Sequence, residues 1–460
     1  MEDPKRLEEG EFGNGTKRAT VANDDQDKKV AETVHGNEEK SRTTLDLPEE
    51  QKEEQPLIKH KTKRVATLDA FRGLTIVLMI LVDDAGEAYP RIYHSPWNGC
   101  TLADFVLPFF LFIVGVAVAL ALKRIPEVKS AIRMIILRTL KLLFWGILLQ
   151  GGYSHAPYNL SYGVDMKHIR WCGILQRIAL VYFVVALIEA LTTKLRPTSL
   201  KSGHFSIFTA YKWQWIGGFV AFVIYMVTTF SLLVPDWSFL VNEDDKAERY
   251  TACTFSSPGS GPFRADAPSW CHADAPFEPE ELLSSISAIV TGTIGIHYGH
   301  VLIHYKGHAE RLKQWVLMGI GLLIVACVLH FTDAIPINKQ LYCFSYVCFT
   351  AGAAAIVFCG LYILIDVWGL RTPFLFLEWI GMNAMLVFVM AAQGIFAAFV
   401  NGWYFKNPDN NLVKWIQQHV FIDVWKSERL GTLLYVIFAE ITFWAVVSGI
   451  LHKLGIYWKL

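Results

Sequence analysis

Several signatures of soluble enzymes are absent from this sequence. The eight cysteines form no CxxC pair, so neither a zinc centre nor a thiol-redox centre is predicted. There is no Walker motif, no GxGxxG following a strand and no HExxH motif, which argues against a nucleotide-binding domain or a zinc protease. The formal net charge is zero and no basic block adjoins a nucleic-acid motif, so no nucleic-acid partner is expected.

Charge is scarce in the chain as a whole. Only 18% of the residues are charged and 53% are hydrophobic, which indicates an all-α polytopic membrane protein whose core faces lipid. About 20 apolar residues in a helix cross a bilayer, and ten stretches approach that length. They lie at 65–83, 101–122, 131–151, 170–193, 212–234, 284–304, 313–332, 343–366, 374–400 and 430–453.

The first of these stretches contains two charges. Asp69 and Arg72 are three residues apart, so a helix would present them on one face, where they could pair away from lipid.

Residues 1–64 are polar and nearly free of aromatic side chains, which predicts a disordered cytosolic tail ahead of a membrane domain at 65–460. The tail has no apolar run typical of a cleaved signal peptide, so the first span is expected to target the chain. It ends with EEQPLI at 53–58, a pattern typical of an acidic dileucine sorting signal and also common by chance.

Basic residues flank alternate ends of the spans. Under the positive-inside rule, their positions predict cytosolic termini and an outward-facing loop between the first two spans. Two features of the predicted outer side agree. Asn159 begins a glycosylation acceptor, and Cys253 and Cys271 could form a disulfide in the loop at about 235–283, which otherwise looks irregular.

The outward loop between the first two spans concentrates polar side chains. Neutral histidine can take a proton near neutral pH, and an adjacent carboxylate would orient it. His94 is therefore the principal catalytic candidate, as a general base or as a nucleophile that carries an acyl group, against the alternative of an ordinary loop histidine. Its candidate partners are Asp83, Asp84 and Asp104, and Trp97 and Asn98 are candidate binding residues.

Polar residues inside the other spans are further candidates, because burying them in a membrane is costly. Gln176 and Arg177 lie near the outer end of the fourth span, and Asn383 lies nearer the middle of the ninth. For the reaction implied by the family resemblance given below, Asn98, Asn383 and Arg177 are candidate donors to an oxyanion, and Arg72, Arg177 and the cytosolic basic loops are candidate phosphate contacts.

A stripe of histidines at 297, 300 and 304 could bind a metal ion by spacing alone. No carboxylate or cysteine accompanies it on that turn. Phosphate binding or interfacial packing is the favoured interpretation, and no metal is expected.

Six segments in this order resemble the membrane domain of the heparan-α-glucosaminide N-acetyltransferase family: LDAFRGLTIVLMILVDDAG, HSPWNGCTLADFVLPFFLFIVG, ILQRIALVYF, SSISAIVTGTIGIHYGHVLI, PINKQLYCFSYV and GMNAMLVFV. The resemblance covers about residues 65–455 and does not extend to the large luminal N-terminal domain of the animal enzyme. The HSPWNG hairpin is its most specific part.

The resemblance implies transfer of acetyl from cytosolic acetyl-CoA to the amino group of a terminal glucosamine across the membrane. By motif position, His94 would be catalytic, and Asp83 stands where relatives have an asparagine that lines the site. A lysosomal, vacuolar or other endomembrane is implied, with the plasma membrane, another acceptor and a homodimer left open. The competing interpretations are a transporter or channel with a path of buried charges, and a scaffold that lost activity.

Overall fold

The computed structural model describes residues 65–95, 98–123, 125, 127–150, 171–195, 206–231, 239–243, 246–250, 282–407 and 410–458. Several predictions lie outside these residues and remain predictions. They concern the polar tail of residues 1–64, Trp97, the glycosylation acceptor Asn159, and the cysteine pair Cys253 and Cys271.

The first half of the described chain runs through helices α1 (Ala66–Ala85), η1 (Leu102–Phe105), α2 (Val106–Leu122), α3 (Val128–Leu148), α4 (Ile174–Leu191), η4 (Thr193–Leu195), α5 (Ser206–Ala210) and α6 (Lys212–Ser231), followed by strands β1 (Phe239–Glu243) and β2 (Lys246–Tyr250). The second half begins with α7 (Leu282–His304), α8 (His308–Phe331), α9 (Phe344–Tyr362), η7 (Ile363–Val367) and η8 (Thr372–Phe374).

The chain ends with α10 (Leu375–Met382), α11 (Ala384–Val387), η9 (Phe388–Ala392), α12 (Ile395–Asn401), α13 (Leu412–Ile416), η10 (Gln417–Ile422), α14 (Asp423–Trp425), α15 (Glu428–Tyr435), η11 (Val436–Glu440) and α16 (Ile441–Lys453). Of these, η7, η9, η10 and η11 are short π-helical segments. Such segments interrupt otherwise regular helices and are frequent at functional sites.

The expectation of an all-α chain needs one correction. Strands β1 and β2 form an antiparallel hairpin within the loop that the sequence analysis treated as irregular, with Phe239 opposite Tyr250 and Glu243 opposite Lys246. Two residues connect the strands, the commonest length for a hairpin. The Gly, Pro and Ser residues that suggested an irregular loop follow β2 in the sequence. The composition of the loop as a whole therefore did not indicate the two strands that precede them.

All ten predicted apolar stretches overlap helices, but ten membrane spans are not confirmed. In the described part of the chain, six helical segments are long and apolar enough to cross a membrane, and a bent pair raises the number to seven. Helices α1 and α3 are not among them, because each carries four charged residues. These are Asp69, Arg72, Asp83 and Asp84 in α1, and Lys129, Arg133, Arg138 and Lys141 in α3.

The outward faces of several helices are apolar, as a lipid environment requires. On α8, Leu317, Ile324 and Phe331 are 69%, 58% and 81% exposed. Contiguous apolar surface of this kind is unfavourable in water and marks a surface that another apolar phase covers. The helical residues therefore fit a multi-pass membrane protein.

Helices α2 and α7 pack closely along much of their length. Gly115 of α2 faces the backbone of Gly292 and Ile296, and Gly295 of α7 faces the backbone of Phe112. A Cβ atom at either glycine would collide with a main-chain carbonyl of the opposite helix. Small residues at such contacts allow membrane helices to approach and gain dispersion energy.

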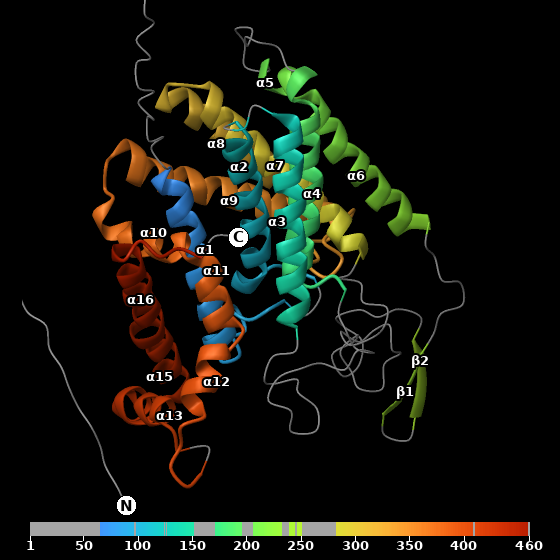
Figure 1. Cartoon of the computed structure of the whole chain (residues 1–460). Helices are drawn as coiled ribbons and strands as arrows, with labels where there is room; N and C mark the ends of the chain where they lie inside the picture. The colour runs from blue at the N-terminus through green and yellow to red at the C-terminus, as the bar shows by residue number, and fades with distance from the viewer. Residues whose placement is uncertain are drawn as a thin grey trace, which may run out of the picture. The chain divides into compact units, whose positions relative to one another are not determined.

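Helix α1 packs against α10, and α10 packs in turn against α16, so segments far apart in sequence lie side by side (Figure 1). The helix beginning with η8 and α10 breaks at Asn383, and the part from Ala384 to Ala392 is turned by 71°. Backbone irregularity at membrane depth is tolerated where it is buried in protein or lines a cavity. The broken helix is therefore expected to line a cavity beside α1.

The contact between α2 and α7 can be tested with Gly295→Ala. Alanine normally stabilises a helix relative to glycine by about 1 kcal/mol. At this position we expect a net loss of about 1–3 kcal/mol, because the added methyl group forces the two helices apart. The measurement is the thermal unfolding midpoint of the purified protein in detergent.

Gly321→Ala in α8 is the matched control, because no atom lies within 4 Å of the position that its Cβ would take. An equal rise in the midpoint for both variants would show that α2 and α7 are not in close contact.

Candidate active site

His94 lies in the polar segment between the end of α1 and the start of η1, where the sequence analysis placed the catalytic centre. Its Nδ1 atom is 2.9 Å from Oδ1 of Asp104, one of its three predicted partners. The side chain of Asp104 is fully buried, whereas that of His94 is 42% exposed. The carboxylate is thus fixed inside the protein, and the imidazole extends from it toward open space.

Asp104 holds the hairpin together through its second oxygen. Oδ2 accepts hydrogen bonds from the backbone N–H of Ser95 at 3.2 Å, from the backbone N–H of Thr101 at 2.9 Å and from the Thr101 hydroxyl at 3.0 Å. Thr101 and Asp104 form a capping box at the beginning of η1. This pairing satisfies backbone donors that the start of a helix leaves free.

The contact with Asp104 determines which nitrogen of His94 is available for chemistry. When Nδ1–H donates to a carboxylate, the lone pair of a neutral imidazole lies on Nε2. The carboxylate also stabilises the cation that forms if Nε2 takes a proton. This is the arrangement of an oriented general base or nucleophile.

A second segment, residues 335–343 between α8 and α9, is tied to the hairpin. The N–H of Gly99 donates to the carbonyl of Ile337 at 2.8 Å, and Asn98 forms an antiparallel bridge with Asn338. Gly99 has φ +112°, a conformation that L side chains rarely adopt. Asn98, a predicted binding residue, thus contacts another loop through backbone and side chain.

This second segment supplies a residue that the sequence analysis missed. Nζ of Lys339 lies 3.0 Å from Nδ1 of His94 and 3.7 Å from Oδ1 of Asp104. Lys339 is 245 residues further along the chain than His94. Its only sequence signal was its position in PINKQLYCFSYV, one of the segments that carry the family resemblance.

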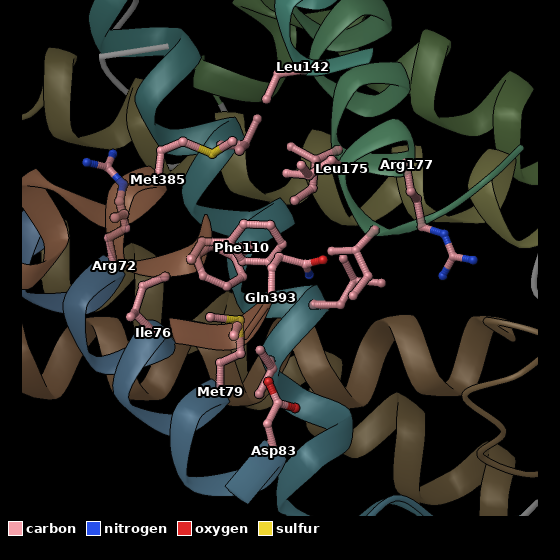
Figure 2. Close-up of a pocket in the computed structure, with 18 of the residues that line it drawn as sticks. Arg72, Ile76, Met79, Asp83, Phe110, Leu142, Leu175, Arg177, Met385 and Gln393 are labelled. Carbon is pink, nitrogen blue, oxygen red and sulfur yellow. The ribbon is translucent and has the colours of Figure 1, made fainter. Parts of the chain in front are cut away.

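His94, Asp104 and Lys339 line a cavity of about 690 Å³. Five of the predicted site residues line it, namely Arg72, Asp83, His94, Asp104 and Arg177. Much of the remaining wall is apolar, with Ile76, Met79, Phe110, Leu142 and Met385 among its side chains (Figure 2). The volume and the few polar groups are typical of a small-molecule site.

One face of α1 forms a continuous wall of this cavity. Arg72, Ile76, Met79 and Asp83 recur every three or four residues and all line it. Figure 2 shows Arg72 and Asp83 at opposite ends of this row. Eleven residues separate them, so the cavity follows α1 for about 16 Å at 1.5 Å per residue.

Arg72 is fixed by two contacts at its end of the cavity. Its Nη1 atom donates to Oδ1 of Asp69 at 3.1 Å and to the carbonyl of Gly381 at 3.3 Å. The expectation that Asp69 and Arg72 pair on one face of the helix is confirmed. Gly381 lies two residues before the break at Asn383, so the backbone next to the break contributes to the cavity.

Arg138 of α3 is a further cation in the cavity wall, and the sequence patterns did not indicate it. Its guanidinium lies 4.9 Å from the centre of the Tyr182 ring. Its Nε atom is buried and has no hydrogen-bond partner among the described residues. Buried donors are normally satisfied, so an anionic ligand is a natural partner for this side chain.

Three predicted site residues have structural neighbours of their own and are not part of the described cavity wall. Asp84 shares a hydrogen bond with Glu440 of η11, which requires one proton between the two carboxyl groups. Gln176 is buried beside Gly146 and Gly173. Asn383 is buried, and its Oδ1 accepts from the backbone N–H of Trp458 at 3.4 Å.

Arg177 lines the cavity, but Figure 2 shows its side chain extending away from Phe110 and Gln393. Its guanidinium lies 5.9 Å from the centre of the Tyr342 ring. Tyr342 is fully buried in the segment that also carries Lys339, and burial raises the pKa of its hydroxyl. Arg177 therefore connects α4 to this segment.

In the histidine stripe, the side chains at 297 and 300 are buried and the one at 304 is exposed. Nε2 of His300 lies 3.0 Å from Oε1 of Glu189 on α4, and both side chains are buried. His304 contacts the Tyr211 hydroxyl at 2.7 Å. Among the described residues, no group of three His, Cys, Asp or Glu side chains is arranged to hold a metal ion. Packing between helices accounts for this stripe.

Cys100 is the one thiol beside the hairpin carboxylate. Burial, with a further contribution from the Asp104 carboxylate, raises the pKa of this thiol. A protonated thiol is a poor nucleophile. His94 is therefore the better-prepared nucleophile of the hairpin.

Comparison with known proteins supports the family resemblance. Residues 64–237, which include α1, the hairpin and α2 to α4, match the family model described as heparan-alpha-glucosaminide N-acetyltransferase, catalytic. The chain is similar to heparan-alpha-glucosaminide N-acetyltransferase. The resemblance inferred from the motifs is thereby confirmed.

The mouse (Mus musculus) protein of that name is 28% identical over 426 residues, and the human (Homo sapiens) protein is 29% identical over 430 residues. Each match covers 86% of this chain and 60% of the relative. The chain thus spans less than two thirds of the length of these curated relatives. Lys339 and the break at Asn383 lie outside the segment that matches the family model.

The tie between the hairpin and the 335–343 segment can be tested with Asn338→Ala. Losing the side-chain hydrogen bond from Asn338 to Oδ1 of Asn98 should let the hairpin open more often and expose Cys100. We expect alkylation of Cys100 to accelerate about fivefold, which corresponds to the roughly 1 kcal/mol of one hydrogen bond. Peptide mass spectrometry after timed alkylation gives the rate.

Glu87→Ala, an exposed position in the loop after α1, is the control and should leave this rate unchanged. Equal rates in the wild type and Asn338→Ala would mean that the segment does not hold the hairpin.

Proposed function

We propose that residues 65–460 form a transmembrane acetyltransferase that moves acetyl from acetyl-CoA to the amino group of a glucosamine-like sugar. The observation that carries this proposal is the contact of 2.9 Å between Nδ1 of His94 and the buried Asp104 in the wall of an elongated cavity. The names of the matched relatives supply the substrate class.

His94 would act through Nε2. The acceptor must attack as a free amine, so its nitrogen loses a proton as the amide C–N bond forms. Nε2 accepts this proton, the thioester C–S bond breaks, and coenzyme A leaves as a thiolate that is then protonated. Asp104 holds the imidazole in place and stabilises its cation.

A second route uses His94 as an acetyl carrier. Nε2 attacks the thioester carbonyl and releases coenzyme A, and the amine then attacks the acetyl-imidazole and regenerates the neutral ring. The same geometry supports both routes. They differ in whether acetylated protein accumulates without an acceptor.

The cavity suits an activated thioester with an anionic end. Its apolar middle would hold the pantetheine arm and keep water from the thioester. Arg72 and Arg138 are candidate contacts for the phosphates of coenzyme A, and Arg138 has an unsatisfied buried donor. Along α1, Arg72 lies about 16 Å from Asp83, at the other end of the row of cavity-lining residues. This separation would allow the two substrates to enter from different ends.

The orientation of the chain in the membrane is part of the proposal. The basic loops support cytosolic termini and a luminal or outward-facing His94. The enzyme would then work in a lysosomal, vacuolar or other endomembrane, or in the plasma membrane. Lipid, acetyl-CoA and a glycan acceptor are its proposed partners, and a homodimer is a candidate assembly. The test is a protease-sensitive tag in the hairpin loop after α1, whose cleavage only from the cytosolic side would contradict the orientation.

The decisive experiment for the reaction is transfer of labelled acetyl from acetyl-CoA to glucosamine by the purified protein in detergent. Loss of a general base typically costs 10²–10⁴-fold in rate, so His94→Ala should lose about that factor. His419→Ala, an exposed histidine on η10, is the control and should keep wild-type activity. Unreduced transfer by His94→Ala would rule out this mechanism.

The two routes can be separated by omitting the acceptor. Label found on the His94 peptide after rapid denaturation at neutral pH supports the acetyl carrier, and its absence in the same samples supports the general base.

The phosphate contact can be tested with Arg138→Ala. We expect the KM for acetyl-CoA to rise about tenfold, because a hydrogen bond to a charged group contributes about 1.5–3 kcal/mol. Arg133→Ala is the matched control, since Arg133 lies five residues earlier on the same helix with its side chain exposed. Equal KM values for the two variants would remove Arg138 from the binding site.

A further inference from the structure

Lys339 lies beside the catalytic pair, although it comes from a distant part of the chain. The 335–343 segment fixes its backbone: Leu341 N–H donates to Oδ1 of Asn338 at 2.9 Å, and Tyr342 N–H donates to the carbonyl of Lys339 at 3.0 Å. The lysine side chain is only 21% exposed. Its ammonium group is therefore held at the site by an ordered turn.

Nδ1 of His94 faces two groups but has only one hydrogen-bonding position. Oδ1 of Asp104 is 2.9 Å away and Nζ of Lys339 is 3.0 Å away. Nδ1 can donate to the carboxylate or accept from the ammonium, and a neutral ring cannot do both at once. The partner that Nδ1 contacts determines the tautomer of the ring. The tautomer in turn determines whether Nε2 carries a proton or a free lone pair.

The charges at the site decide between these states. A buried carboxylate needs a countercharge, and two groups within reach can supply it: protonated His94 and Lys339. Lys339 lies 3.7 Å from Oδ1 of Asp104, which is within ion-pair distance. With the lysine present, the carboxylate is balanced and a second cation on the imidazole would be repelled by the first.

We propose that Lys339 is the countercharge of Asp104 and thereby keeps His94 neutral, with its Nδ1–H directed to Asp104 and its Nε2 lone pair free. Lys339 is thus a positioning residue that acts through His94. The other titratable groups near this pair include Asp83 of α1, Tyr93 and Cys100 of the hairpin, Arg177 of α4 and Tyr346 of α9. Lys339 is the cation within ion-pair distance of Asp104.

The consequence for catalysis rests on the proposed function. A protonated His94 has no lone pair on Nε2 and can neither accept the amine proton nor attack the thioester. The lysine would preserve the reactive form even in an acidic compartment. The charge state itself can be measured without any acetyl transfer.

The experiment uses diethyl pyrocarbonate, which modifies neutral but not protonated imidazole. The full chain in detergent is labelled for a short time, and the His94 peptide is quantified by mass spectrometry. At about pH 6.5, the ordinary titration midpoint of imidazole, we expect labelling of His94 to be about tenfold slower in Lys339→Met than in the wild type. The difference should vanish at about pH 9, where imidazole is neutral.

Matched variants separate charge from structure. Lys339→Arg keeps the cation and should label at nearly the wild-type rate. Adding Asp104→Asn to Lys339→Met removes both charges and should restore rapid labelling, which a packing role of the lysine does not predict. The exposed His419 on η10 is the internal reference for reagent and pH. Lys339→Gln gives the same test if the methionine variant does not fold.

The outcomes are distinct. Equal labelling of His94 in the wild type and in Lys339→Met at about pH 6.5 would overturn the role of Lys339, whatever the activity. Slow labelling that the double variant restores would support it. A wild-type protein that shows this labelling pattern but transfers no acetyl would contradict the proposed function and leave the role of Lys339 intact.

Discussion

The burial of the Asp104 carboxylate is the constraint on which this site depends. A charge removed from water must be compensated by donors and countercharges, or the fold would be strongly destabilised. Here the hairpin supplies the donors through Ser95 and Thr101, and a distant segment supplies Lys339. Each donor holds one piece of backbone, so the buried charge starts η1, closes the hairpin and fixes the position of His94. The group that organises the loop is thus the group that orients the imidazole.

The cavity is explained by the cost of placing charged side chains in a membrane. Helix α1 carries more charged residues than lipid tolerates, so its charged face must turn toward protein or an internal space. Arg72 meets Asp69 and the Gly381 carbonyl, Asp84 meets Glu440, and Asp83 lines the cavity. The irregular backbone at Asn383 is sheltered in the same place. An internal cavity beside α1 is therefore the feature that makes this helix compatible with a bilayer.

Local patterns predicted much of the structure. The ten apolar stretches indicated helices, the spacing of Asp69 and Arg72 indicated their pairing, and the hairpin sequence indicated His94 with a nearby carboxylate. Three candidate partners for His94 could not be separated, because the choice depends on how the turn folds back on Asp104. The predicted number of spans was not confirmed, and the reason is physical. Length and hydropathy do not reveal whether charges within a helix, such as those of α3, face lipid or an internal cavity.

The remaining site residues depend on contacts between distant segments, which composition and periodicity do not encode. Lys339 reaches His94 only because the 335–343 segment pairs with the hairpin through Asn98 and Asn338. Arg138 enters the cavity because α3 packs beside α4. Both residues are cations, and both face the cavity that contains His94. Lys339 lies against the buried Asp104 carboxylate, and Arg138 has an unsatisfied hydrogen-bond donor. The cavity therefore contains a balanced pair of charges beside His94 and, on α3, a cation that can bind an anionic ligand. This asymmetry is what a site needs to hold an anionic carrier by one end and use its activated group at the other.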